Sequence, residues 1–477
     1  MEPNWITQRS FLTPNRIGLR FGEESWTFKQ LNTISIDYAK KLVALKLKQG
    51  DRVAILAKST PELVHIIYGC MQAQVEIVFL NNRLSEKELA YQLEDADVHL
   101  LIVEDSFQHL ISFENMYTFT QLSEVVGDEA YTPSSEWDAS DTISIMYTSG
   151  TTGFPKGVRQ TVENHRMSAI GSALNIGVRE TDCWLCAVPI FHISGFSILM
   201  RSIIYGMTVA LYEKFDEVSV AKEITNGTVT HISVVSVMLE RILSYMEAHN
   251  LKTHPKFQIV LAGGGSIPVA FLQRAIALKL PVAQTYGMTE TSSQTCTLSA
   301  EDAMCKIGSA GKPLFFYQVQ IDKANESVEI GEICIRGPQV TPGYIGQFAH
   351  VQSQVDGWLH TGDIGYLDED GYLYVVDRRS DLIISGGENV YPAEIENVLL
   401  SHPAVLEAGV CGKEDATWGH VPIAFIVKKF EVSEEVLFMH CNNQLAKYKV
   451  PKQILFVNEL PRNGANKLMR HKLKELL

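Results

Sequence analysis

The residues best suited to chemistry lie in the string YTSGTTGFPKG, residues 147–157. Its glycines allow unusual backbone angles and a close approach of a ligand to the main chain. The backbone N–H groups and hydroxyl groups of such a loop can surround phosphate oxygens, and Lys156 adds a positive charge. The loop is not a Walker A motif, because Pro155 precedes Lys156 and Gly157 follows it. The alternative is a polar surface loop. The string therefore predicts a phosphate-binding loop that consists of Thr148, Ser149, Gly150, Thr151, Thr152, Gly153 and Lys156.

Three strand-like segments end in loops of this kind. Segment 143–148 runs into the phosphate loop, segment 258–265 ends in three glycines, and segment 281–287 runs into the string MTETSSQ. In open α/β sheets, ligands collect beyond the carboxyl ends of the strands. We therefore expect the three loops to converge on one binding site.

The elements that must position these loops alternate along the chain. Residues 27–47 carry apolar residues at mostly helical spacing, and 51–59 and 75–81 contain short apolar runs typical of buried strands. This alternation predicts layered α/β structure with mainly parallel sheets. Residues 108–138 are weakly patterned and are expected to form surface loop. Residues 331–376 read as short strands and turns, and Pro392 suits the start of a helix over 392–400.

Composition narrows the class of protein. The chain has 477 residues, 46% of them hydrophobic, and its formal charge is 41 − 55 = −14, which makes it a poor non-specific binder of nucleic acid. The sequence shows no apolar signal region at its start and no run of 18 apolar residues, so no integral membrane segment is expected. Eight irregularly spaced cysteines, including Cys183 and Cys186, favour reduced thiols over a disulfide framework or a zinc site. We therefore expect a cytoplasmic protein; a homo-oligomer is left open.

Five motifs in order give the chain a family resemblance. The phosphate loop, YGMTE (286–290), TGD (361–363), DRRSDLIISGGENVYPAEIE (377–396) and PRNGANKLMR (461–470) resemble those of the adenylate-forming enzymes, which include acyl-CoA synthetases, adenylation domains and luciferase. The resemblance covers essentially the whole chain. It implies a large N-terminal lobe of layered α/β subdomains plus a β-rich subdomain, followed by a small mobile α+β domain. The implied boundaries are 1–378, a hinge at 379–380, and 381–477.

The resemblance also implies a two-step reaction. A carboxylate attacks the α-phosphate of ATP to give acyl-AMP and pyrophosphate, and a thiol such as coenzyme A then attacks the acyl carbon. Lys467 matches the lysine that bridges the carboxylate and the α-phosphate, and Glu290 matches the Mg²⁺ ligand. Thr289 is implied to bond the α-phosphate, Tyr286 to lie near adenine, and Asp363 to bind ribose. The other implied ATP-binding residues are Gly263, Gly264, Gly265, Gly287 and Arg378.

Two chemistries in one cleft require two positions of the small domain. In the family, rotation at the hinge presents the lysine for adenylation and then a glycine loop for thioester formation. Here that loop is Ser385, Gly386 and Gly387, which would line the coenzyme A tunnel. Many relatives carry Asp or Lys at the hinge, and Ser380 departs from them.

The segment 189–206 bears on the identity of the acid. His192 matches a position that borders the acyl pocket, and Ser194 and Arg201, seven residues apart, share a helix face. Arg201 lies among apolar residues, so it is either a surface arginine with a buried stem or the partner of a substrate carboxylate. Several strings are most similar to the bacterial o-succinylbenzoate–CoA ligases of menaquinone biosynthesis. Their substrate keeps one carboxylate that is not activated, which suits Arg201, Ser194 and Ser293, with His192 and Gly264 also lining the pocket.

Other functions stay open at this stage. A different acyl- or aryl-CoA synthetase would prefer octanoate or benzoate, and a stand-alone adenylation enzyme would load a carrier protein instead of coenzyme A. A non-catalytic ATP-binding protein is disfavoured, because Lys467, Glu290 and Asp363 are all present. An oxidoreductase is disfavoured because no G-x-G-x-x-G string opens a helix.

Overall fold

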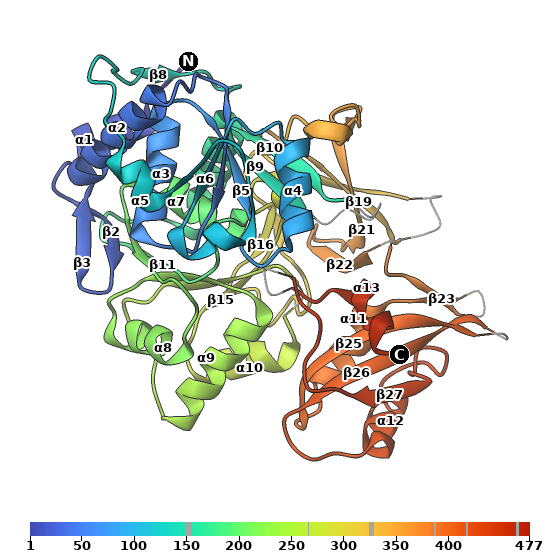
Figure 1. Ribbon diagram of the computed structural model, residues 1–477. Coiled ribbons are helices and arrows are strands. Elements are labelled where there is room, and N and C mark those ends of the chain that lie inside the picture. Colours follow the sequence, from blue (N-terminus) through green and yellow to red (C-terminus); the bar gives the residue numbers. More distant parts are fainter. Residues whose placement is uncertain are drawn as a thin grey trace.

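The chain folds into a large N-terminal lobe and a smaller C-terminal module that lies beside it (Figure 1). The computed structural model describes residues 1–148, 154–265, 267–323, 329–378, 380–385, 388–415, 418–463 and 467–477, with the backbone alone at 378, 388 and 389. The predicted fold class, α/β layers with a β-rich part and a small α+β part, is confirmed. Within these residues, no helix is both long and apolar enough to cross a membrane.

A six-stranded sheet forms the first layer of the large lobe. Its order is β10-β9-β5-β4-β6-β7, and all neighbours are parallel except β10 and β9. Short apolar runs such as Val53–Leu56 are buried on both faces, as expected for parallel strands under helices. Its strands are β4 (Arg52–Leu56), β5 (Glu76–Leu80), β6 (Leu100–Val103), β7 (Met116–Thr118), β9 (Thr142–Thr148) and β10 (Lys156–Thr161). The helices of this part of the chain are α2 (Phe28–Ala44), α3 (Pro61–Gln72), α4 (Glu86–Asp95), α5 (Phe119–Glu124) and α6 (Val162–Ile176).

A nine-stranded sheet forms the second layer, in the order β17-β16-β15-β14-β13-β11-β12-β2-β3. One cluster of buried apolar side chains contains residues of both sheets and of α2 and α3. The strands are β2 (Ile17–Phe21), β3 (Glu24–Thr27), β11 (Cys183–Cys186), β12 (Thr208–Leu211), β13 (His231–Val234), β14 (Ile259–Ala262), β15 (Val282–Tyr286), β16 (Cys296–Leu298) and β17 (Lys312–Pro313). The helices are α1 (Trp5–Leu12), α7 (Ile193–Tyr205), α8 (Glu217–Asn226), α9 (Ser236–Ala248) and α10 (Val269–Ala277).

The β-rich part is a five-stranded antiparallel sheet in which β18, β19, β21 and β20 follow one another and β22 pairs with β21. Its strands are β18 (Gln318–Asp322), β19 (Gly331–Arg336), β20 (Gln354–Val355), β21 (Trp358–Leu367) and β22 (Leu373–Arg378). The C-terminal module follows with its own sheet and its own buried clusters. Its elements are β23 (Ile383–Ser385), β24 (Glu388–Val390), α11 (Pro392–Leu400), β25 (Val405–Asp415), β26 (Gly419–Lys428), α12 (Glu434–Asn442), β27 (Gln453–Phe456) and α13 (Arg470–Leu473).

The expectation of surface loop over 108–138 was wrong in part. This segment holds β7, α5 and the short strand β8 (Glu136–Trp137), which pairs with β1 (Glu2–Pro3). Phe119, Leu122 and Trp137 are buried in the main core. Elements of two to six residues are too short to show a hydrophobic periodicity in the sequence. Their burial is therefore decided by packing against distant parts of the chain.

Acid sensitivity is expected from the buried histidine of α6. His165 lies against Ser144, 2.9 Å from Nε2 to Oγ, and burial lowers its pKa to about 3. The unfolded chain binds a proton at this residue below about pH 6.5, whereas the folded chain does not, so stability falls on acidification. His165→Gln is expected to flatten the decline of unfolding free energy between pH 6 and 4 by up to about 1.4 kcal/mol per pH unit. Denaturant titrations of the unaltered protein and of His165→Gln at several pH values measure this effect. Equal slopes of unfolding free energy against pH in the two proteins would contradict the prediction.

Candidate active site

The hairpin of β9 and β10 carries the predicted phosphate loop. Thr148 and Lys156 face each other as cross-strand partners at the end of the hairpin where the loop begins. The predicted loop residues Ser149, Gly150, Thr151, Thr152 and Gly153 lie outside the described residues. The ammonium of Lys156 lies over the rings of Tyr344 and Phe348, 5.1 and 5.3 Å from their centroids. These rings hold the cation at the loop without neutralising it.

Tyr344 links this lysine to the predicted metal ligand. Glu290 lies in the short 3₁₀ helix η2 (Thr289–Thr291) and is buried. Burial, and secondarily the charge of Glu290, raises the pKa of Tyr344 well above its usual range. Gln160 of β10 donates from Nε2 to the carbonyl oxygen of Thr289 at 2.8 Å. The edge strand β10 of the first sheet and the turn after β15 are therefore held together. The predicted convergence of three loops stays a prediction, because most of the phosphate loop lies outside the described residues.

The predicted adenine and ribose residues are in direct contact. The hydroxyl group of Tyr286, at the end of β15, donates to Oδ2 of Asp363 at 2.7 Å. Burial and the neighbouring Asp363 carboxylate raise the pKa of Tyr286, so the phenol stays protonated and can donate. Asp363 lies in β21 opposite Arg378 of β22, so strand pairing places these two predicted nucleotide-binding residues side by side along the backbone.

Tight backbone packing surrounds these groups. Gly263, Gly264 and Gly265 follow β14, and Gly264 has a φ of +81°, which favours glycine. At Gly287 a Cβ atom would lie 1.7 Å from the carbonyl oxygen of Ser293, so a larger residue cannot fit without moving the backbone. The following turn is strained, since Ser292 and Ser293 have φ values of +52° and +114°.

Gly287→Ala is expected to lower the free energy of unfolding by about 1–3 kcal/mol, because overpacking here must displace main-chain atoms. Gly265→Ala is the matched control for stability, because its Cβ would meet nothing within 4 Å. Thermal unfolding of the two variants measures the difference. Equal destabilisation by both would contradict the steric argument.

The predicted acid-binding residues lie on α7 and beside it. His192 precedes the helix, Ser194 lies in its first turn, and Arg201 lies two turns further along. Ser197 connects them: its hydroxyl lies 3.4 Å from the carbonyl oxygen of Ser194 and 3.4 Å from Oγ of Ser293. The structure thus brings Ser194, Arg201 and Ser293 into one neighbourhood.

Arg201 is 1% exposed, so the surface interpretation was wrong. Its Nη2 donates to Oε1 of Gln294 at 3.0 Å and to Oγ of Ser293 at 3.3 Å, and its guanidinium lies 4.9 Å from the centroid of the Trp184 ring. In the part of the chain that the structure describes, no Asp or Glu forms an ion pair with Arg201, and its Nε has no hydrogen-bond partner. Burial lowers the pKa of Arg201. A buried cation with only neutral partners is costly unless an anion joins it.

His231 lies in the same environment but carries no charge at neutral pH. Its ring stacks on Trp184 with centroids 5.0 Å apart, and burial, partly offset by Asp182, lowers its pKa to about 4. The neighbouring charge of Arg201 lowers it further. At neutral pH the imidazole is therefore uncharged, so it neither adds to nor neutralises the positive charge of Arg201.

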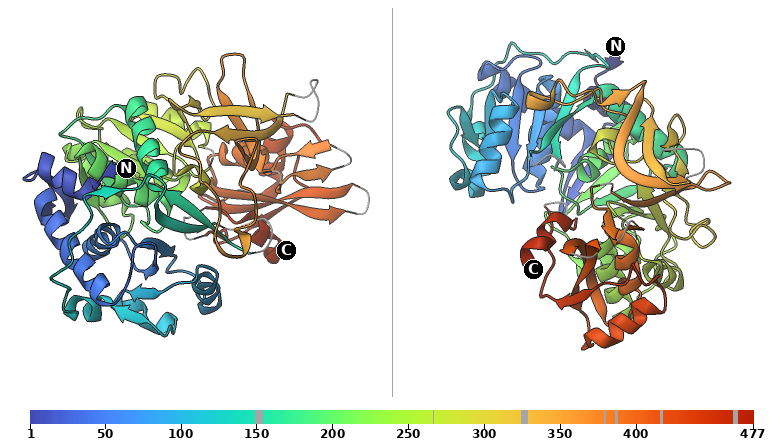
Figure 2. Two further views of the ribbon diagram at one scale, coloured as in Figure 1. Left: turned by 90° about the horizontal axis from the view of Figure 1, so that it is seen from above. Right: turned by 90° about the vertical axis from the view of Figure 1, so that its right-hand side faces the viewer.

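The C-terminal module supplies the remaining predicted residues. Lys467 is exposed and precedes α13, and its N–H donates to Oδ1 of Asn463 at 2.9 Å. Helix α13 lies on the side of the module that faces the large lobe (Figures 1 and 2), where Lys472 acts electrostatically on Glu88 of α4. Ser385 is buried at the end of β23, opposite Gly419. Gly386 and Gly387 lie outside the described residues.

Sequence reasoning missed the residues that shape these contacts. Gln294 and Trp184 contact Arg201, and Tyr344 interacts with both Lys156 and Glu290. Gln294 directly follows Ser293 in the string MTETSSQ, so proximity could have identified it. Trp184 lies inside the C-x-x-C string, whose cysteines are buried free thiols. A signal for Tyr344 is absent from the sequence, because its role depends on a loop that returns from beyond β19.

Comparisons with known proteins agree with this geometry. The AMP-binding enzyme family matches residues 7–345, and the AMP-binding enzyme C-terminal domain matches 394–467. A 2–succinylbenzoate–CoA ligase of Bacillus cytotoxicus is 48% identical over 100% of this chain and 98% of its own length. The o-succinylbenzoate CoA synthetase of Bacillus subtilis with its acyl-adenylate intermediate OSB-AMP superimposes with a TM-score of 0.92, at 44% identity over 99% of this chain and 98% of its own. Its complex with ATP and magnesium gives the same TM-score and identity over 99% of both chains.

Proposed function

The chain belongs to the AMP-binding enzyme family, and on that premise we propose that it is an ATP-dependent acid–CoA ligase that converts o-succinylbenzoate to o-succinylbenzoyl-CoA. The choice of acid depends on one observation: Arg201 is a buried cation whose hydrogen-bond partners, Ser293 among them, are neutral. The ring carboxylate, which is not activated, supplies the missing anion. A monocarboxylate such as octanoate would leave Arg201 buried and uncompensated.

The residues fit the proposed first step. The succinyl carboxylate oxygen attacks the α-phosphorus of ATP, and the bond to the pyrophosphate oxygen breaks, which gives acyl-AMP. Glu290 offers a hard oxygen ligand of the kind Mg²⁺ takes, and bound Mg²⁺ would neutralise charge on the phosphates. Lys156, Thr148 and Thr289 would hold phosphate oxygens, and Tyr286, Asp363 and Arg378 would hold the nucleoside. Lys467 would bridge the two anions that react.

The second step forms the thioester. The thiolate of coenzyme A attacks the acyl carbon, and AMP leaves as the acyl–phosphate bond breaks. Ser385, with Gly386 and Gly387, is proposed to line the path of coenzyme A, and His192 to border the acyl pocket with Gly264. Among the residues that the structure describes, all eight cysteines are free thiols, as a reducing compartment favours. A cytoplasmic location is therefore part of the proposal.

We further propose the division 1–378 and 381–477 with a hinge at 379–380. Strand β22 pairs inside the β-rich sheet, whereas β23 pairs inside the C-terminal sheet, so the sheets change across this point. Arg470 spans it, donating to Asp377 at 2.6 Å on one side and to Glu396 at 2.7 and 2.9 Å on the other. Lys429 and Glu240 form a further ion pair between the two parts at 3.2 Å. Such polar contacts can exchange between two poses.

Ser380→Pro tests the hinge, because proline fixes φ near −65° and so restricts the rotation. The variant is expected to keep at most one half-reaction at the normal rate. Pyrophosphate release and thioester formation from added acyl-AMP, measured separately, reveal which one. A variant that retains both rates would contradict a hinge at this residue.

A panel of acids tests the function. Pyrophosphate release is measured with o-succinylbenzoate, benzoate and octanoate, each with and without coenzyme A, and with a phosphopantetheinyl carrier in its place. We expect release with o-succinylbenzoate and a thioester with coenzyme A. Higher activity with octanoate or benzoate would favour a different CoA synthetase, and transfer to the carrier alone would favour a stand-alone adenylation enzyme.

A further inference from the structure

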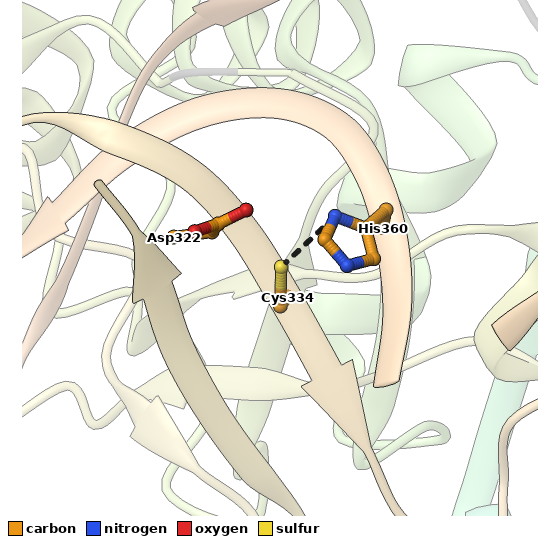
Figure 3. A group of neighbouring side chains, drawn as sticks. All are labelled: Asp322, Cys334 and His360. Carbon is orange, nitrogen blue, oxygen red and sulfur yellow. Dashed lines mark hydrogen bonds between the residues drawn. The ribbon is translucent and has the colours of Figure 1, made fainter. Parts of the chain in front are cut away.

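Three side chains that can bind a metal lie together on the β-rich sheet (Figure 3). Asp322 ends β18, Cys334 lies in β19, and His360 lies in β21, and one ligand atom of each is within 4.8 Å of the other two. Cys334 and His360 are direct cross-strand partners. Asp322 reaches them diagonally, since its own partner is Glu332, two residues before Cys334. The ladder is irregular between Glu332 and Cys334, which changes the direction of these side chains.

The spacing of the ligand atoms around His360 fits a tetrahedral ion. Nδ1 of His360 lies 3.5 Å from Sγ of Cys334 and 3.4 Å from Oε2 of Glu332. Around tetrahedral zinc, with bonds of about 2.3 Å to sulfur and about 2.1 Å to nitrogen and oxygen, these separations would be about 3.6 and about 3.4 Å. A single Nδ1 has one proton or one lone pair and cannot make two good hydrogen bonds at such lengths. A cation between these side chains could be bound by the nitrogen, sulfur and oxygen atoms at the same time.

Burial and donor type define the class of ion. Cys334 is buried, whereas Asp322 and His360 are exposed, so an ion can enter from solvent. A set of sulfur, nitrogen and oxygen donors selects zinc or a similar transition ion over Mg²⁺, which takes oxygen ligands. The site is thus different in chemistry from the one at Glu290.

We propose that Asp322, Cys334 and His360 bind a Zn²⁺-class ion. Glu332 lies outside this group of three, beside Nδ1 of His360, and a rotation of its side chain would bring its carboxylate to the fourth position. The ion would be coupled to the nucleotide site through the backbone. Oε1 of Glu332 accepts from the N–H of Gly362 at 2.8 Å, and Gly362 precedes Asp363 in β21. This binding goes beyond the proposed ligase reaction and does not depend on it.

Cobalt binding to the full-length protein tests the site. The chain is freed of metal with a chelator and titrated with Co²⁺ in the absence of ATP and Mg²⁺. Thiolate coordination gives a sulfur-to-cobalt charge-transfer band in the near ultraviolet. We expect this band to saturate at one Co²⁺ per chain and to disappear when Zn²⁺ is added, because zinc binds more tightly.

Matched cysteine variants identify the ligand. Cys334→Ser is expected to abolish the band, and Cys305→Ser, which alters the exposed cysteine, is expected to keep it. Asp322→Asn, an exposed change that should not disturb folding, is expected to keep the band but to weaken Co²⁺ binding about tenfold or more. The absence of a thiolate band in the unaltered protein, or its survival in Cys334→Ser, would overturn the proposal.

Discussion

Lys467→Ala is expected to slow acyl-AMP formation by about 100- to 1,000-fold, the loss typical when one group that stabilises transition-state charge is removed. The reason is that the carboxylate and the α-phosphate are both anions, and their approach requires a positioned cation. Lys467 is exposed and lies just before α13, so its removal leaves no cavity and should not unfold the chain. Pyrophosphate release with o-succinylbenzoate and ATP measures the effect.

Two controls separate chemistry from damage to the fold. Lys474→Ala alters another exposed lysine a few residues away and is expected to leave pyrophosphate release unchanged. The Lys467→Ala protein should still convert added acyl-AMP and coenzyme A to the thioester, because the role proposed for this lysine is confined to the first step. Normal acyl-AMP formation in the variant, or loss of both half-reactions together, would contradict the assignment.

The α/β layers could be predicted because they depend on local pattern. The apolar runs at 51–59 and 75–81 became β4 and β5, and Pro392 begins α11 as its fixed φ angle suggests. The contact of Tyr286 with Asp363 joins residues 77 positions apart, and only the ordered motifs hinted that they act together. Roles that follow from the family motifs stay predictions until the variants are measured.

The environment of Arg201 could not be predicted, because a sequence does not show burial of a single charge. The apolar neighbours of Arg201 suited a surface helix with a buried stem as well as a fully buried side chain. Its burial is decided by Trp184 of β11 and by Gln294 beyond β15, which come from distant parts of the chain. Likewise, the cluster on β18, β19 and β21 depends on strand register, which no local string of residues determines.

Arg201→Gln is expected to raise the KM for o-succinylbenzoate by about 100-fold or more, since removal of one partner of a buried ion pair costs about 2–5 kcal/mol of binding. Glutamine keeps a polar group near Ser293 and Gln294 but removes the charge. The matched substrate is 4-oxo-4-phenylbutanoate, which lacks the ring carboxylate. Its KM should change little between the two proteins, because it offers Arg201 no anion. Steady-state kinetics with both acids measure the two effects.

The stability of the variant decides between a binding role and a structural one. If Arg201 were held for structure, its loss would lower the free energy of unfolding and would impair both acids equally. In the unliganded protein the guanidinium is desolvated against neutral partners, which opposes the gain from the Trp184 ring. We therefore expect unfolding free energy in Arg201→Gln to stay level or to rise, while discrimination between the two acids disappears. Under this proposal, the buried charge of Arg201 lowers the stability of the protein without substrate and raises its affinity for one dianionic acid. Selection of a substrate commonly involves such an exchange of stability for specificity.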